Sequence, residues 1–136
     1  EIDIHSMPLT ILSIYGDTKK RRNLLLNEAI ANPRDITITS FENLRINKEA
    51  IINTLPYDCL IVDESHRIKS MKALRTKAVL DAALKAKYRY LLSGTPTTRS
   101  PTDIYAQMQM LSPHILLNWN YYKFCENFIV YTIQLT

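Results

Sequence analysis

Residues 57–66, which read Y-D-C-L-I-V-D-E-S-H, decide how this chain folds. The apolar run inside this stretch is continuous rather than alternating, a pattern typical of a strand covered on both faces of a parallel sheet. The run ends in Asp63 and Glu64, so both acids should lie at the carboxyl edge of the sheet, where open α/β folds bind ligands. One carboxylate there can hold a metal ion through water while the other takes a proton from an attacking water, as nucleoside triphosphate hydrolysis requires.

A second predicted strand, at residues 89–93, ends in a polar loop of its own. Residues 93–96 read S-G-T-P, and one helix, at residues 74–86, separates this strand from the first. Glycine and proline form turns by themselves, so the loop alone would carry little weight. Neighbouring parallel strands, however, would place both motifs along one edge of the sheet. Ser93 and Thr95 could then hydrogen-bond the acidic pair or a bound water.

Strand and helix patterns alternate along the rest of the chain. Further strands are expected at residues 9–15 and 35–39, and further helices at 18–31, 41–44, 48–55, 100–111 and 119–128. We expect Asn47 to cap the helix that starts at residue 48. This alternation predicts an α/β fold built on a parallel sheet. The chain has 136 residues and no internal repeat, which indicates one domain or a part of one.

Composition excludes several classes of protein. Hydrophobic residues make up 46% and charged residues 22%, as in an ordinary globular domain, and no apolar run is long enough to cross a bilayer. The first residues lack the features of a secretory signal, and we expect an intracellular protein of the cytoplasm or nucleus with no membrane partner. The net charge of +4 weakly favours an anionic partner. Cys59 and Cys125 are expected to be buried free thiols.

Phosphate binding has no loop of its own in this sequence. The two glycines, Gly16 and Gly94, are not followed by Lys-Ser or Lys-Thr, so the G-x-x-x-x-G-K-[ST] pattern is missing from residues 1–136. Two cysteines and three scattered histidines also offer no metal cage. The acidic pair therefore resembles half of a catalytic site.

Two strings together resemble a known family. They are Y-D-C-L-I-V-D-E-S-H-R-I-K-S, from residue 57, and Y-R-Y-L-L-S-G-T-P-T-T-R-S, from residue 88, and they resemble the DEAH-type box and the S/T-G-T-P motif of Swi/Snf-like DNA translocases, ATPases of helicase superfamily II. The resemblance extends over nearly the whole chain. It includes Tyr15-Gly16 ahead of a basic helix, I-T-I-T-S-F-E-N-L at residues 36–44, residues 104–113, and then Phe124 and Phe128. The resemblance implies a partial RecA-like sheet with flanking helices. Residues 1–136 would be an incomplete first ATP-binding lobe, without its P-loop and without the second lobe.

Carried over by position, the resemblance gives each matching residue a role. Asp63 would hold Mg²⁺, mostly through water, and Glu64 would activate or orient the water that attacks the γ-phosphate of ATP. His66 would couple this site to the S-G-T-P loop. That loop would link the nucleotide state to the DNA track through Ser93, Gly94, Thr95 and Pro96. The residues that would contact the nucleic acid are Ser40, Asn43, Arg67 and Lys69.

The basic side chains also have plainer interpretations. His66 could be a surface imidazole. Lys72, Arg75 and Lys77 form an ordinary solvated helix face in our interpretation, and residues 19–22 form a solvated first helical turn.

The resulting hypothesis is a motor fragment whose parent couples ATP hydrolysis to movement on double-stranded DNA. ATP and Mg²⁺ would be its cofactors, and the chain alone is expected to be inactive. Two alternatives stay open: a strand-separating or restriction-type helicase of the same superfamily, and a non-catalytic α/β binding module. Because a partial parallel sheet exposes apolar edges, self-association is a further expectation.

Overall fold

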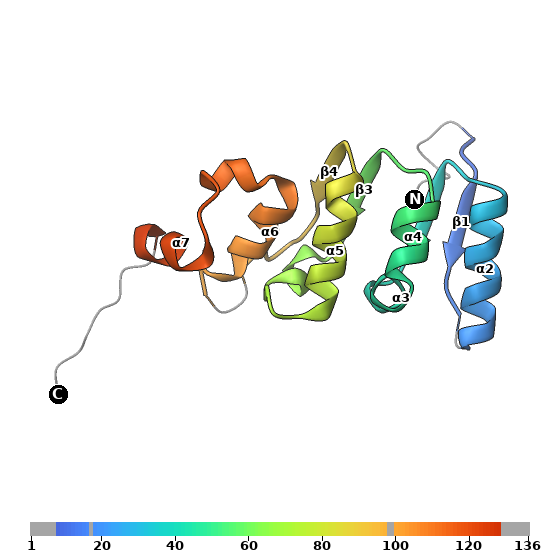
Figure 1. The fold of residues 1–136 in the computed structure, drawn as a ribbon, viewed down its shortest axis with the longest axis horizontal. Helices are drawn as coiled ribbons and strands as arrows, with labels where there is room; N and C mark the ends of the chain where they lie inside the picture. Colours follow the sequence, from blue (N-terminus) through green and yellow to red (C-terminus); the bar gives the residue numbers. More distant parts are fainter. Residues whose placement is uncertain (1–7, 17, 98–99, 129–136) are drawn as a thin grey trace. The chain divides into compact units, whose positions relative to one another are not determined.

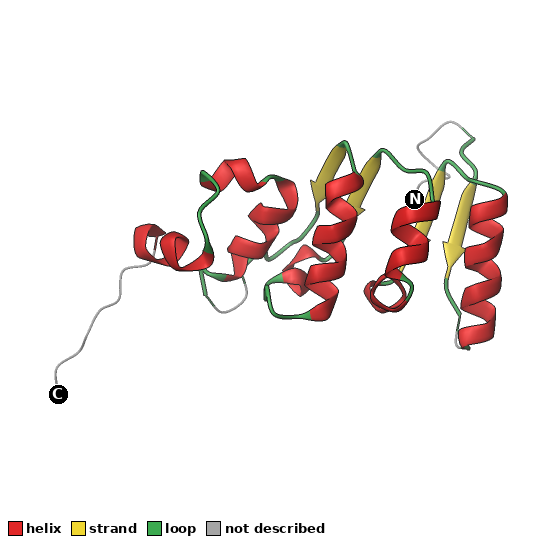
Figure 2. Ribbon diagram, in the orientation of Figure 1, coloured by secondary structure: helices red, strands yellow, loops and turns green. Residues whose placement is uncertain are grey.

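The computed structural model describes residues 8–16, 18–97 and 100–128 of the chain (Figure 1). Contacts divide the chain into two compact units, one ending at Tyr57 and the other beginning at Asp58. Each unit holds one pair of parallel strands together with its own helices (Figure 2). The predicted alternation of strands and helices is confirmed, and both strand pairs are parallel, as expected.

The first unit is built around the strand pair β1 and β2. Its elements are β1 (Ile11–Ile14), α2 (Lys19–Ala31), β2 (Ile36–Thr39), α3 (Phe41–Ile46) and α4 (Lys48–Thr54). The strands run in parallel with Ile14 opposite Thr39. Thr18 caps α2 through its side chain, and Leu26 and Ala29 on the inner face of that helix are buried. The apolar spacing of the sequence thus locates this helix within one residue.

A polar clamp fixes the start of the β1–β2 pair. Asp35 Oδ2 accepts hydrogen bonds from Thr10 Oγ1 at 2.6 Å and from Thr10 N at 2.8 Å, and Asp35 N donates to Thr10 Oγ1 at 3.1 Å. The Thr10 hydroxyl, followed by its backbone N–H, holds the pKa of Asp35 below its ordinary value. The two strands therefore enter the sheet in a defined register.

Side-chain amides join α3 and α4. Ser40 Oγ accepts the Asn43 N–H at 3.1 Å and so caps α3. Asn43 Nδ2 donates to Thr39 Oγ1 at 2.8 Å, and Asn47 Nδ2 donates to Asn43 Oδ1 at 2.7 Å. Asn47 is the N-cap residue of α4, as expected, but its side chain makes no capping bond to that helix, because its amide donates to Asn43 instead.

The second unit is built around the strand pair β3 and β4. Its elements are β3 (Cys59–Val62), the 3-10 turn η1 (Ser65–Ile68), α5 (Leu74–Lys85), β4 (Tyr88–Leu91), α6 (Asp103–Leu111), the 3-10 turn η2 (Pro113–Leu116) and α7 (Tyr121–Phe128). The two short turns were not predicted. Residues 98 and 99, which belong to the string quoted from residue 88, lie outside the described residues.

One face of the β3–β4 pair is apolar and exposed. Burial alternates along β3, so Val62 is buried while Cys59 and Ile61 are exposed, and Tyr90 is exposed opposite Ile61. The expectation of a strand covered on both faces is therefore wrong, because the described part of the chain covers only the face that carries Val62. The predicted burial of the Cys59 thiol is wrong for the same reason, and Cys125 is half-buried.

Aromatic packing anchors α6. Tyr105 of α6, Leu116 of η2 and Phe124 of α7 form a buried cluster, and the Tyr105 hydroxyl donates to the Trp119 carbonyl at 2.8 Å. Burial, with a smaller contribution from Cys125, raises the pKa of Tyr105. This cluster fixes the position of α6, which supplies a buried side chain to the site. Across the described residues, no helix is both long and apolar enough to cross a membrane.

Candidate functional site

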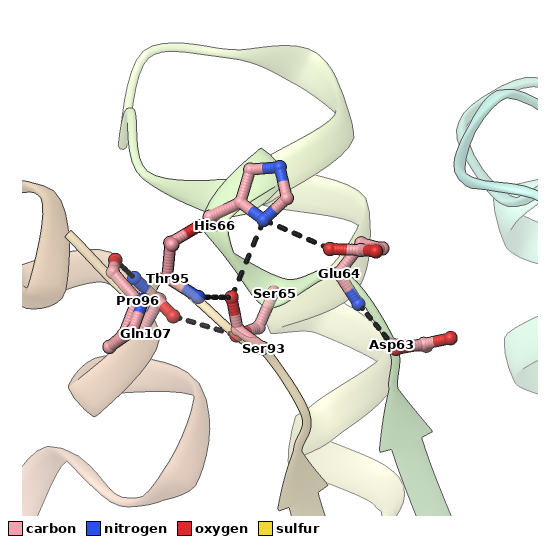
Figure 3. Close-up of polar contacts among 8 residues, drawn as sticks. All are labelled: Asp63, Glu64, Ser65, His66, Ser93, Thr95, Pro96 and Gln107. Atoms are coloured by element: carbon pink, nitrogen blue, oxygen red, sulfur yellow. Dashed lines mark hydrogen bonds and ion pairs between the residues drawn. The ribbon is translucent and has the colours of Figure 1, made fainter. Parts of the chain in front are cut away.

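The acidic motif and the S-G-T-P loop leave neighbouring strands at the same level. Val62 of β3 lies opposite Leu91 of β4, and the Leu92 N–H donates to the Val62 carbonyl at 2.9 Å. One step further, the Ser65 N–H donates to the Leu92 carbonyl at 2.9 Å. The predicted edge therefore exists in the second unit, and it brings Asp63, Glu64 and His66 close to the loop that begins at Ser93 (Figure 3).

The two acids are exposed and locally oriented. Asp63 Oδ1 accepts a hydrogen bond from the Glu64 N–H at 2.8 Å, which fixes the orientation of the aspartate side chain. Glu64 itself has φ 51° and ψ 47°, in the left-handed region that side chains other than Asn, Asp and Gly seldom adopt. Such a backbone costs on the order of 1 kcal/mol or more and is concentrated at functional sites. This left-handed backbone at Glu64 turns the chain sharply after β3. The side chains of Asp63 and Glu64 therefore do not alternate between the two faces of the sheet as strand residues do.

His66 lies between Glu64 and the S-G-T-P loop. Its Nδ1 is 3.1 Å from Glu64 Oε2 and 3.4 Å from Ser93 Oγ (Figure 3). The Ser93 hydroxyl oxygen also accepts the Thr95 N–H at 3.2 Å. With a proton on Nδ1, the imidazole donates to the glutamate, and without it the ring accepts from the serine. The side chains of Glu64 and His66 are 60% and 31% exposed, so water reaches this link.

A buried polar link runs beneath the exposed one. Ser65 Oγ donates to Gln107 Oε1 at 2.8 Å, and Gln107 Nε2 donates to the Pro96 carbonyl at 2.6 Å. Sequence reasoning missed Gln107. The available signal was weak: a glutamine stands where the apolar pattern of α6 continues on both sides, in I-Y-A-Q-M-Q-M from residue 104.

The space beside Gly94, where a side chain would lie, is open. A Cβ built on Gly94 would meet no atom within 4 Å, and the residue does not adopt a positive φ. The described structure therefore does not itself require a glycine here.

Two basic residues follow the acids. Arg67 is exposed on η1, and Lys69 Nζ lies 3.9 Å from Asp103 Oδ2 at the start of α6. The lysine is half-buried, and the ion pair joins the end of η1 to the helix that carries Gln107.

The other two predicted nucleic-acid residues belong to the first unit. Ser40 is exposed and caps α3, whereas Asn43 is 1% exposed and spends its amide on Thr39 and Asn47. A pocket of about 200 Å³ lies beside them, and its lining includes Tyr15, Gly16 and Arg22 as well as both residues. The motifs at residues 15–16 and 40–43 thus meet within one unit.

Asp63 could bind a metal ion only if a substrate and water supplied the remaining ligands. Within the described residues, no group of three or more His, Cys, Asp or Glu is placed to hold a metal ion. Magnesium is usually bound by one or two carboxylates, with substrate phosphates and water completing its shell. An exposed aspartate oriented by the Glu64 N–H suits that mode of binding.

Comparison with known proteins agrees with this geometry. A family profile described as the SNF2-related domain matches residues 1–130. The ISWI chromatin-remodeling complex ATPase CHR11 of Arabidopsis thaliana is 29% identical over 107 residues, which make up 79% of this chain and 10% of that protein. The DNA annealing helicase and endonuclease ZRANB3 of Bos taurus is 32% identical over 101 residues, 71% of this chain and 9% of that protein.

The fold is also found in a solved structure. The chain is similar to the Sulfolobus solfataricus SWI2/SNF2 ATPase core in complex with dsDNA, with a TM-score of 0.64 and 25% sequence identity. The matched region makes up 88% of this chain and 23% of the solved chain. This likeness confirms the expected partial RecA-like fold of helices and parallel strands. The chain spans no more than a tenth of the two curated relatives named above. By the extent of the profile match, the chain belongs to the SNF2-related domain family.

Proposed function

We propose that this chain is part of the ATPase motor of a Swi/Snf-like translocase, which couples ATP hydrolysis to movement on double-stranded DNA. The observation that carries the proposal is the pairing of two motifs at one sheet edge: the acids after β3 and the S-G-T-P loop after β4, joined by hydrogen bonds. Membership of the SNF2-related family, whose activity depends on a nucleotide, supports it. So does the structural neighbour, an ATPase core in complex with dsDNA.

Each acid has a separate task in this proposal. Asp63 would hold Mg²⁺, which would supply charge neutralisation at the phosphates. Glu64 accepts a proton from the attacking water or orients it. His66 holds the Glu64 carboxylate through Nδ1 and can exchange that contact for the Ser93 hydroxyl. The four residues D-E-S-H thus act as the DEAH-type box of the motor.

Nucleotide binding in this proposal needs a phosphate loop and an arginine finger that residues 1–136 do not supply. A phosphate loop cradles the β- and γ-phosphates in such enzymes, and an arginine finger can add a factor of roughly 10³–10⁵ to the rate. We propose that the incomplete lobe of residues 1–136 works together with a P-loop segment and a second RecA-like lobe. The activity therefore belongs to the full-length protein.

DNA contacts come from the exposed members of the predicted set. Ser40 can still donate its hydroxyl hydrogen to a phosphate oxygen after accepting from Asn43, and Arg67 carries its charge at the surface. Asn43 is buried and Lys69 pairs with Asp103, so we assign these two to positioning. The motor would act inside the cell, as its chromatin-remodelling relatives suggest.

The exposed apolar face of β3 and β4 needs a cover. Ile61, Tyr90 and Leu92 are 60%, 54% and 51% exposed. We propose that other segments of the motor pack on this face in the full-length protein, and that a second copy can do so in the isolated chain. Light scattering of the isolated chain tests the second part: a monomer at high concentration would count against it.

The decisive assay is phosphate release by the full-length protein with and without duplex DNA. We expect duplex DNA to stimulate hydrolysis of ATP in the presence of Mg²⁺. Replacing Glu64 by Gln should lower the rate by about 10²–10⁴, the usual contribution of a general base. Retained ATP binding by the variant would show that the site still assembles.

Hydrolysis that is insensitive to Glu64→Gln would contradict the proposed role of this acid. The absence of ATP hydrolysis in wild-type full-length protein would favour the alternative of a non-catalytic module.

A further inference from the structure

Gln107 bonds to both loops of the site from below. The side chain is 2% exposed, and its neighbour Ser65 is 1% exposed. Gln107 Oε1 accepts from Ser65 Oγ at 2.8 Å, while its Nε2 donates to the Pro96 carbonyl at 2.6 Å (Figure 3). The same Nε2 also donates to the Asp103 carbonyl at 3.1 Å. Ser65 directly follows the acidic pair, and Pro96 ends the S-G-T-P loop. One side chain therefore ties the two motifs together.

We propose that Gln107 is a positioning residue that couples the acidic loop to the S-G-T-P loop during the motor cycle. The proposal deepens the function proposed above and rests on it. The exposed route through His66 is longer, at 3.4 Å to Ser93, and water competes for its atoms. The buried route has no such competitor, and hydrogen bonds in a low-dielectric interior hold their geometry more tightly.

The chemistry of the link calls for an amide. The Ser65 hydroxyl donates and needs an acceptor, whereas the Pro96 carbonyl accepts and needs a donor. Glutamine offers an acceptor and a donor on one planar group; leucine offers neither, and an ionised glutamate offers acceptors only. A shift of the acidic loop is thus passed through the rigid amide to the carbonyl of the second loop.

The test compares DNA stimulation in full-length variants. The quantity measured is kcat for ATP with saturating duplex DNA divided by kcat without DNA. Gln107→Leu should lower this ratio by roughly tenfold, the scale of one hydrogen bond between buried partners. The KM for ATP should stay within about twofold, because the link makes no contact with the phosphates in this account.

Gln109→Leu is the matched control. It makes the same substitution two residues further along α6, where the amide lies at the long distance of 3.5 Å from the Trp119 carbonyl. This variant should keep the wild-type stimulation ratio. A general weakening of α6 would lower stability in both variants without changing the ratio in the folded fraction.

Two further variants separate the halves of the link. Ser65→Ala removes the donor and leaves the bond to Pro96, whereas Gln107→Glu can keep the bond from Ser65 and removes both donations to carbonyls. Each should lower the stimulation ratio, and the double variant Ser65→Ala with Gln107→Leu should fall no further than Gln107→Leu alone. These milder changes also decide the matter if Gln107→Leu fails to fold.

Two outcomes are distinct. Wild-type stimulation in folded Gln107→Leu or Gln107→Glu protein would overturn the coupling role while leaving the proposed function intact. A wild-type protein without DNA-stimulated hydrolysis would instead remove the proposed function, and the inference with it.

Discussion

The two units end their parallel strands in different ways. After β2, the Ser40 hydroxyl oxygen accepts the capping bond of α3 and Asn43 is bonded to Thr39 and Asn47, which leaves the Ser40 O–H open to a partner. After β3, Asp63 and Glu64 remain exposed, and Glu64 holds a left-handed backbone. The first ending uses its amide groups within the chain, whereas the second keeps carboxylates exposed at some cost in backbone energy.

The two edges are therefore suited to different tasks. Both pairs are parallel, and both offer a carboxyl edge. Of these two edges, the second has the acids Asp63 and Glu64 exposed, and His66 and Gln107 connect the acidic motif to the neighbouring loop by hydrogen bonds. The first edge is better suited to a rigid surface for a partner such as DNA.

The largest expected effect is catalytic and belongs to the second edge. Asp63→Asn should lower DNA-stimulated ATP hydrolysis of the full-length protein by about 10² or more, because the carboxylate that we propose as the Mg²⁺ ligand loses its charge. Its stability should change by no more than about 0.5 kcal/mol, as for other exposed positions. Asp58→Asn, at the opposite end of the same strand, is the control and should keep its activity. An equal loss of ATP hydrolysis in both variants would contradict a special role for the acids that follow β3.

The next effect concerns stability and belongs to the first edge. Asn43→Leu keeps the volume of the side chain but leaves Thr39 and Asn47 without its amide, which should destabilise the protein by about 1–3 kcal/mol in urea unfolding. Asn53→Leu, on the exposed surface of α4, should stay within about 0.5 kcal/mol of wild type. A stable Asn43→Leu protein would mean that the amide network does not hold this edge.

A smaller effect depends on pH and also belongs to the first unit. The folded pKa of Asp35 lies below its ordinary value of 3.8, so the unfolded chain binds the proton more readily. The stabilisation is complete above the ordinary value and is lost as the pH falls through the lowered folded one. Asp35→Asn should therefore remove part of the acid sensitivity seen in unfolding curves at several pH values. Identical acid sensitivity in the variant would show that the clamp to Thr10 does not form.

The smallest expected effect sharpens the picture of the second edge. Gly94→Ala should change stability by no more than about 0.5 kcal/mol, because the added Cβ has open space and no positive φ must be maintained. Thermal unfolding measures this directly. A clear loss of DNA-stimulated hydrolysis in the same variant would show that another group approaches Gly94 during the cycle. A loss of stability would contradict the open geometry.

Local pattern was enough for most of the architecture. The order of strands and helices, the start of the helix near residue 18 and the shared edge of residues 63 and 93 all follow from short-range signals. These signals work because apolar spacing and turn residues act within a few positions of the chain.

Features that depend on distant partners could not be read in this way. The Asn47 side chain donates to Asn43 rather than to a backbone group of its own helix. The partners of Gln107 lie in loops about ten and forty residues away along the chain. Cys59 is exposed because only one face of its strand is covered in the described residues. In each case the deciding neighbour lies on another element, so a local window of sequence does not contain it.

Movement on DNA tests the central claim most directly. The full-length protein should displace a third strand from a duplex in the presence of ATP and Mg²⁺, and the Glu64→Gln variant should bind the same duplex without displacing that strand. Displacement by Glu64→Gln protein at the wild-type rate, or wild-type protein that hydrolyses ATP on DNA yet never displaces the strand, would contradict the account.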